Sequence, residues 1–202
     1  MSDRERIFEA MIDICVEYGY VNVTVPMVLE RAGVAAADFT SLFDGLEDCF
    51  CAVMEAQTEI AGERILSAYA GEQGWQRQVR AAARTMLDYL LEDLVRARFV
   101  CVEVVYAGDR AQLIRDQLMQ GLFLLIDQGR NEMPDPGSLT PFTAEAIGSS
   151  IYQRMQSALV NDRLEEFETS VPEMMYLVVL PYLGPEAAEE ELALPPTPLP
   201  AR

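Results

Sequence analysis

The chain has 202 residues, of which 50% are hydrophobic and 24% charged. This composition is typical of a globular protein and excludes a disordered one. The formal net charge is −18, from 15 basic and 33 acidic residues, and every basic side chain is an arginine. Because so acidic a chain repels nucleic acid at long range, a nucleic-acid-binding function would need a locally basic surface.

The four cysteines, Cys15, Cys49, Cys51 and Cys101, lie among apolar neighbours in a chain without histidine or a Cys-x-x-Cys pair. This pattern favours buried, reduced thiols over a zinc site, so neither a metal nor a cofactor is expected. No nucleophile stands at a recognisable spacing from a base, so an enzyme is not expected. The N-terminus lacks a signal peptide, and no segment reaches the roughly twenty apolar residues that span a bilayer, which predicts a cytoplasmic protein without membrane contact.

Three helices are predicted in the first fifty residues. Ser2 and Glu5 have the spacing of a capping box at the start of the first helix. Thr24 is the predicted N-cap of the second helix, and Gly33 is expected in the left-handed conformation that ends it. A third helix over residues 36–43 completes a helix-turn-helix, in which the second helix of the pair enters the major groove of DNA.

This region resembles the N-terminal pattern of the TetR-type (TetR/AcrR) transcriptional repressors. The agreement runs without a gap over residues 4–50 and fixes about a dozen spacings, which makes it fairly specific. The matching positions are Arg6, Ile7, Ala10, Gly19, Tyr20, Thr24, Val25, Val28, Ala32, Gly33, Val34, Phe39, Phe43 and Glu47. The resemblance implies an all-α homodimer that binds double-stranded operator DNA and is released by a small-molecule effector.

The resemblance also implies a division of the chain. Residues 1–50 would form a three-helix helix-turn-helix head that binds DNA. Residues 51–184 would form a larger helical domain for effector binding and dimerisation. The acidic, proline-rich composition of residues 185–202 predicts a disordered tail.

The sequence departs from the family at positions that usually contact DNA. Ala35 stands where the family tends to have Ser or Thr, Leu42 where it commonly has His or Tyr, and Leu46 where a Lys usually opens the fourth helix. Asp38 adds a negative charge to the third helix, and residues 1–50 contain three arginines against ten carboxylates. The remaining candidates for DNA contact are Arg4, Arg6, Thr24, Ala35, Ala36, Ala37, Thr40 and Ser41.

Helical periodicity continues through the middle of the chain. Long helices are predicted over residues 46–70, 75–94 and 111–128, with a short buried helix over residues 99–106. The family places its effector cavity among the helices that follow residue 75, and such cavities are mostly apolar. A methionine or aromatic residue at helical spacing is also typical of ordinary core, so both interpretations stay open for each candidate. The candidate cavity residues are Met86, Tyr89, Phe99, Tyr106, Met119 and Phe123.

The last two predicted helices, over residues 142–159 and from residue 170 onward, are candidates for a dimer interface. The final helix is apolar nearly all round, which predicts that a partner subunit covers it in addition to its own subunit. In the family, the last two helices of each subunit form an isologous four-helix interface. The predicted interface residues are Ile147, Ile151, Met155, Met175, Val178, Val179 and Tyr182.

Two functions remain open. The first is a TetR-type DNA-binding regulator, a repressor, controlled by a small and mostly apolar ligand. Without an arginine in the third helix, specificity would depend on Thr40, Ser41, thymine methyl contacts and DNA shape. The alternative is a dimeric ligand- or protein-binding module on the same fold that has lost ordinary operator binding, which the acidic head favours.

Overall fold

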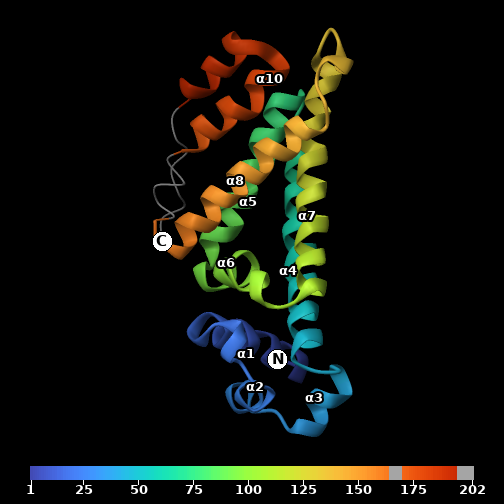
Figure 1. The fold of residues 1–202 in the computed structure, drawn as a ribbon, viewed down its shortest axis with the longest axis vertical. Helices are drawn as coiled ribbons and strands as arrows, with labels where there is room; N and C mark the ends of the chain where they lie inside the picture. Colours follow the sequence, from blue (N-terminus) through green and yellow to red (C-terminus); the bar gives the residue numbers. More distant parts are fainter. Residues whose placement is uncertain (164–169, 195–202) are drawn as a thin grey trace. The chain divides into compact units, whose positions relative to one another are not determined.

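The computed structural model describes residues 1–163 and 170–194, and every regular element in these ranges is a helix (Figure 1). The all-α prediction is therefore confirmed. The chain divides into two compact units, each assembled from two separate stretches. The first unit contains Met1–Ile60 and Asp93–Gln117, and the second contains Ala61–Glu92 and Leu118–Arg202.

The first unit begins with the predicted helix-turn-helix. Its elements are α1 (Asp3–Tyr18), the 3₁₀ turn η1 (Tyr20–Asn22), α2 (Val25–Ala32), α3 (Ala36–Leu42), the first part of α4 (Leu46–Gly71), α6 (Leu94–Cys101), η2 (Glu103–Tyr106) and the first part of α7 (Asp109–Asp127). The capping box of α1 is present, with the backbone N–H of Glu5 donating to Ser2 Oγ at 3.2 Å and that of Ser2 donating to Glu5 Oε2 at 2.7 Å. Gly33 ends α2 at φ 63°, a left-handed conformation that glycine adopts without strain.

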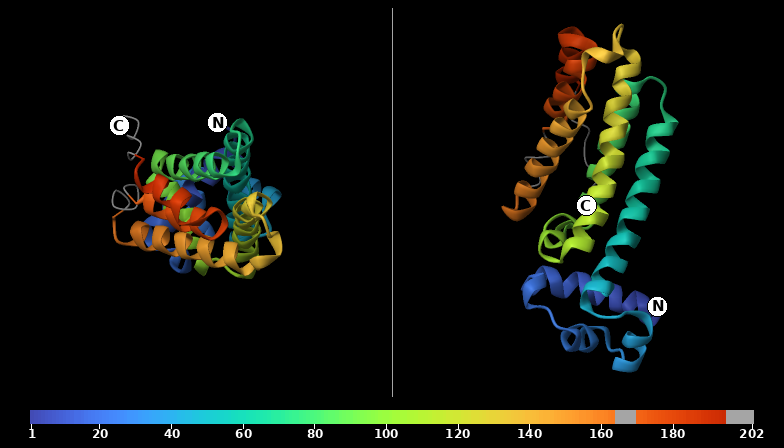
Figure 2. Two further views of the ribbon diagram at one scale, coloured as in Figure 1. Left: turned by 90° about the horizontal axis from the view of Figure 1, so that it is seen from above. Right: turned by 45° about the vertical axis from the view of Figure 1, so that its right-hand side comes forward.

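Aromatic packing joins sequence-distant parts of this unit. The rings of Phe50 in α4 and Phe99 in α6 lie 4.3 Å apart between centroids. The backbone N–H of Tyr20 donates to Glu103 Oε2 at 2.8 Å. Arg110 of α7 donates to Asp48 Oδ1 at 2.6 Å, and the beginnings of α4 and α7 run side by side (Figure 2). The compact unit that holds the helix-turn-helix therefore extends beyond residue 50 and includes residues 93–117.

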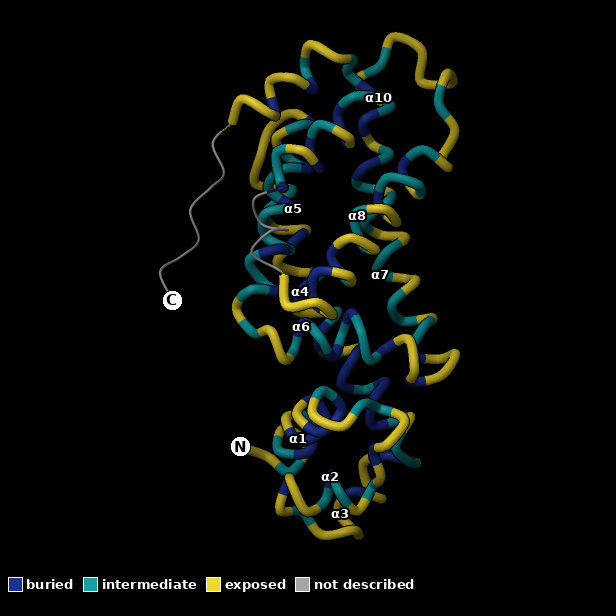
Figure 3. The backbone as a smooth tube through the Cα atoms, turned by 60° about the vertical axis from the view of Figure 1, so that its left-hand side comes forward, coloured by how far each residue is buried: buried dark blue, intermediate teal, exposed yellow. Residues whose placement is uncertain are grey.

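The second unit consists of the remaining parts of α4 and α7, with α5 (Trp75–Glu92), η3 (Gln128–Glu132), η4 (Pro136–Ser138), α8 (Phe142–Val160) and α10 (Val171–Leu192). Trp75 packs edge-on against Tyr182 with 5.0 Å between ring centroids, and its indole N–H donates to the Leu125 carbonyl at 3.0 Å. A Cβ atom on Gly129 would lie 2.5 Å from Trp75 Cζ2, so only glycine permits this close approach. Figure 3 shows how buried and exposed residues are distributed along these helices.

Two predictions about helix boundaries are wrong. The helix expected over residues 99–106 begins earlier, because Asp93 caps α6 by accepting a hydrogen bond from the backbone N–H of Arg96 at 3.0 Å. The tail expected to be disordered from residue 185 is helical as far as Leu192, after a kink at Gly184. Residues 195–202 of that tail, and residues 164–169 of the predicted acidic connection, lie outside the described residues.

A buried ion pair explains why the end of α10 is ordered. Glu191 is 1% exposed and pairs with Arg80 of α5, whose Nε donates to Glu191 Oε2 at 2.8 Å. Gln76 Nε2 donates to the other carboxylate oxygen at 2.5 Å. These contacts hold the segment after the kink on α5, which composition alone does not reveal.

We therefore expect Glu191→Ala to lower the free energy of unfolding by about 1–3 kcal/mol, because it removes the carboxylate that accepts from Arg80 and leaves Gln76 only the Ala187 carbonyl at 3.4 Å. Glu190→Ala removes the same charge from an exposed neighbour and should change stability by less than about 0.5 kcal/mol. Urea unfolding followed by circular dichroism measures both variants. Equal effects would show that the buried pair does not stabilise α10.

Candidate functional site

The exposed surface of α3 carries little polar chemistry. Thr40 Oγ1 donates to the Ala36 and Ala37 carbonyls, each at 3.1 Å, and Ser41 Oγ donates to the Asp38 carbonyl at 2.7 Å. Both hydroxyls are therefore bonded to carbonyls of α3 itself. Ala35 is the N-cap of α3, and Thr24 that of α2, and both are exposed.

Two of the three arginines in the helix-turn-helix region are neutralised by carboxylates. Arg31 pairs with Glu17 at 2.5 Å and with Asp13 at 3.4 Å, and its hydrogen bond holds the pKa of Glu17 below its usual range. Arg6 pairs with Asp3 and donates to the Gly33 carbonyl at 3.4 Å, so it links α1 to the turn between α2 and α3. Its Nε is buried and has no hydrogen-bond partner among the described residues.

Arg4 is different. It is exposed, and its guanidinium carbon lies 5.0 Å from the centre of the Phe8 ring. Among the arginines of residues 1–60, it alone has no carboxylate within ion-pair distance in the described part of the chain. It is therefore the arginine of this region that is most available to a phosphate.

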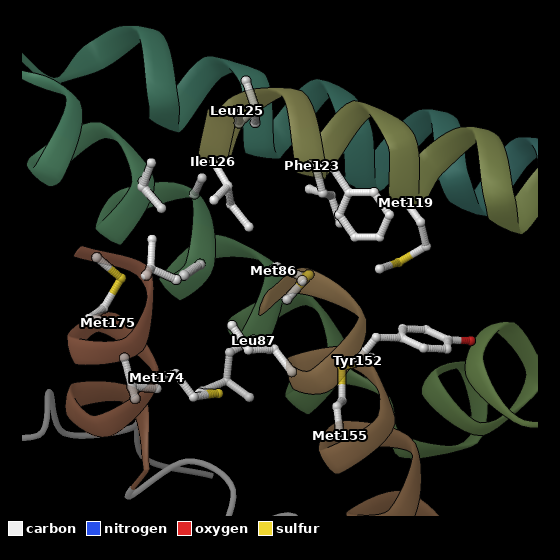
Figure 4. Close-up of a pocket in the computed structure, with 18 residues that line it drawn as sticks. Met86, Leu87, Met119, Phe123, Leu125, Ile126, Tyr152, Met155, Met174 and Met175 are labelled. Atoms are coloured by element: carbon white, nitrogen blue, oxygen red, sulfur yellow. The ribbon is translucent and has the colours of Figure 1, made fainter. Parts of the chain in front are cut away.

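The second unit contains an apolar cavity of about 90 Å³, lined by residues of α5, α7, α8 and α10 (Figure 4). Five methionines contribute to its wall: Met86, Met119, Met155, Met174 and Met175. The wall also includes Phe123 of α7 and Tyr152 of α8. Among the described residues of the wall, the Tyr152 hydroxyl is the only polar side-chain atom.

Of the six predicted cavity residues, three lie in this wall and three do not. Met86, Met119 and Phe123 line the cavity, although ligand binding by them stays a prediction. Phe99 is buried in the core of the first unit, and Tyr106 is 60% exposed on η2. Tyr89 packs beside a separate core cluster, with the Arg64 guanidinium 5.4 Å from its ring centre. Residues of α8 and α10 complete the wall, and α6 and η2, which carry Phe99 and Tyr106, do not contribute to it. Sequence periodicity does not show which helices pack together.

The residues predicted for the dimer interface face the interior of their own subunit. Ile151, Met155, Met175 and Val178 line the cavity, and Ile147, Val179 and Tyr182 belong to the adjoining core. Both helices therefore turn these apolar residues toward the core of the second unit, whereas Leu177 of α10 is 51% exposed.

Gly148 and Tyr152 of α8 and Met174 of α10 also belong to the wall, and none of them was predicted to do so. A Cβ atom on Gly148 would lie 2.5 Å from Phe123 Cδ1, so this glycine lets the ring approach α8. The sequence contained a signal for it, since Gly148, Ser149 and Ser150 form a run of small residues that permits close helix packing.

The buried titratable groups favour structure over catalysis. All four cysteines are free and buried, and burial raises the pKa of the Cys49 thiol to about 12. Burial also raises the pKa of Tyr182 to about 12, so its hydroxyl remains protonated at neutral pH. Within residues 1–163 and 170–194, no three His, Cys, Asp or Glu side chains are grouped so that they could hold a metal ion. None of the described helices is long and apolar enough to cross a membrane.

No protein-family model and no curated protein matches the sequence. Solved structures do match the fold. The fatty acid degradation regulator FadR of Bacillus halodurans is 16% identical, with a TM-score of 0.75, and the match covers 87% of this chain and 97% of that one. FadR of Bacillus subtilis in complex with stearoyl-CoA is also 16% identical, with the same coverage of both chains and a TM-score of 0.76. A putative TetR-family regulator from Syntrophomonas wolfei is 14% identical over 90% of this chain and 95% of that one, with a TM-score of 0.72.

These similarities, together with the helix-turn-helix and the cavity in the second unit, define the class of fold. The chain has the fold of the TetR-type transcriptional regulators, as its N-terminal sequence pattern predicted.

The packing of Gly148 gives a test of the cavity. Gly148→Ala should force the Phe123 ring to move and lower stability by about 1–3 kcal/mol. Gly121→Ala on α7 is the matched control, because a Cβ atom there meets nothing within 4 Å and should stabilise the helix by about 0.5–1 kcal/mol. Thermal unfolding would show the two opposite signs. A stabilising Gly148→Ala would contradict the close contact with Phe123.

Proposed function

We propose that the protein is a TetR-type transcriptional regulator that binds double-stranded DNA as a homodimer and is controlled by a small-molecule effector. The supporting observation is that one chain combines an exposed helix-turn-helix with an apolar cavity in a separate compact unit. The regulator would act as a repressor, and effector binding in the cavity would release it from DNA.

The cavity supports an effector with an apolar body. At about 90 Å³ it is smaller than the roughly 300–1,000 Å³ of common ligand pockets, so the wall has to adjust when a ligand enters. Methionine side chains are unbranched and adapt readily to a new occupant. The Bacillus subtilis structure with stearoyl-CoA supports the same inference, because it shows that a similar fold accepts a ligand with a long hydrocarbon chain.

Operator recognition by α3 would depend on apolar and hydroxyl contacts. Ala36 and Ala37 are exposed and suit thymine methyl groups, and Thr40 and Ser41 could rotate their hydroxyls from the helix carbonyls to DNA. Few cations are available for the phosphates, so we expect a modest affinity with a shallow dependence on salt.

Arg4→Ala should weaken DNA binding and reduce the slope of log K against log salt by about two for a dimer, one phosphate for each subunit. Arg31→Ala should leave the slope unchanged, because Arg31 is already paired with Asp13 and Glu17. Fluorescence anisotropy at several salt concentrations measures both slopes. If Arg31→Ala reduced the slope and Arg4→Ala did not, this assignment of the phosphate contact would be wrong.

The homodimer is proposed on the outward sides of α8 and α10. Leu177 is exposed, and Leu180 and Gly184 are half-buried one and two turns further along α10. This stripe would form the isologous interface with α8 of each subunit.

Leu177→Asp should convert the dimer to a monomer at micromolar concentration, because it places a charge inside an apolar interface. Leu124→Asp is the matched control, since Leu124 of α7 is 63% exposed and lies outside the proposed interface. Light scattering gives the mass of each variant. If the Leu177→Asp variant were still a dimer, the interface would have to lie elsewhere on the subunit.

The second candidate function is a dimeric ligand- or protein-binding module that no longer binds operators. It is favoured by the pairing of Arg6 and Arg31 with carboxylates and by exposed Asp38 on α3. Titration with DNA from the protein's own upstream region, at low and at physiological salt, separates the two functions. The sample is first checked for bound ligand by mass spectrometry. A folded, ligand-free dimer that fails to bind at low salt would favour the second function.

A further inference from the structure

Among the residues that the structure describes, the cavity wall has no charged group. Its described residues are aliphatic, aromatic or methionine side chains and one glycine, and the Tyr152 hydroxyl is their only polar side-chain group. In Figure 4 the Tyr152 side chain extends beside Met119, on the side of the cavity away from Met174 and Met175. The described side chains would therefore present carbon and sulfur to a ligand in this cavity, with at most one hydroxyl.

None of the arginines on the surrounding helices belongs to the described wall. Arg80 pairs with buried Glu191, and Arg84 pairs with Asp88 at 2.9 Å. Arg130 pairs with Asp127 at 2.7 Å and also donates to the Leu139 carbonyl. Arg154 of α8 is exposed to solvent and is not part of the wall. An anionic ligand would have to draw an arginine into the wall from one of these pairs or from solvent, or leave its charge without a partner.

The free-energy cost of an unpaired charge decides between ligand classes. Moving a hydroxyl into apolar surroundings costs about 1–3 kcal/mol by protein mutational data, whereas an isolated ionised carboxylate or ammonium costs far more. An anion meets a further barrier, because the protein itself carries a net charge of −18.

We propose that the effector is an electrically neutral molecule with a hydrocarbon body and at most a hydroxyl-type polar group, and that charged amphiphiles of the same size are excluded. This inference rests on the proposed function, because it assigns the effector to the cavity of the second unit. It separates this protein from a regulator of anionic acyl compounds, even though such a ligand is bound by a similar fold.

The first experiment compares three eight-carbon ligands that differ only in the terminal group: 1-octanol, octanoate and octylammonium. Trp75 is the only tryptophan and is 3% exposed, in the same core as the wall residues Val79 and Val178, so its fluorescence reports binding. Thermal unfolding gives a second measure. We expect 1-octanol to bind at least ten times more tightly than either ion. Comparable binding of octanoate or octylammonium, or binding of none of the three, would overturn the proposal.

A pair of variants on one helix tests whether the cavity is the site of this selection. Met119→Lys places an ammonium group in the wall and should raise octanoate affinity while lowering that of 1-octanol. Leu124→Lys adds the same charge at an exposed position of α7 and should leave the order of the three ligand affinities as in the wild-type protein. The same shift in both variants would locate the effect outside the cavity. Should Met119→Lys fail to fold, the affinities of the three ligands for the wild-type protein still test the proposed ligand class.

Measuring DNA affinity in the presence of each ligand separates this proposal from the proposed function. Tight binding of 1-octanol with no DNA binding under any condition would contradict the regulator and support the ligand class. Release of DNA by octanoate alone would support the regulator and contradict the ligand class.

Discussion

A shortage of positive charge is the constraint on which the structure depends. Fifteen arginines face 33 carboxylates, and the chain has neither lysine nor histidine. Arginine can satisfy a carboxylate with two parallel hydrogen bonds, so each one that is paired in this way is removed from other uses. The distribution of these few cations therefore affects the packing within each unit and, under the proposed function, would affect how DNA is contacted and which ligands the cavity admits.

Several arginines join elements that are far apart in the sequence. Arg96 of α6 contacts Glu9 of α1 across 87 residues, and Arg80 of α5 contacts Glu191 of α10 across 111 residues. The Arg80 pair includes a buried carboxylate, whose loss of one partner is costly, whereas exposed pairs contribute little. The pairing of Arg80 with Glu191 therefore explains an ordered helix end that follows Pro185 and a run of glutamates.

The local features of this fold could be predicted from the sequence, because each depends on residues a few positions apart. The capping box of Ser2 and Glu5 and the left-handed Gly33 are of this kind, and both are present. The composition of the cavity wall depends instead on which helices meet. Phe99 has the helical spacing of a cavity residue, but it packs on Phe50 in the other unit. Likewise, α10 was predicted to pack against its own subunit as well as a partner, and periodicity did not show that Met175 and Val178 line a cavity there.

The same shortage of cations bears on both parts of the proposed mechanism, DNA binding and effector binding. A protein with a net charge of −18 repels both the DNA phosphates and any anionic effector at a distance, and the repulsion weakens as salt rises. Under this proposal, contacts with DNA would depend on a few exposed groups such as Arg4, and the apolar cavity would favour a neutral molecule. An uncharged effector avoids the repulsive field altogether, so its affinity would be independent of salt while that of DNA is not. Such a regulator would keep the same affinity for its ligand at ionic strengths that change its affinity for the operator.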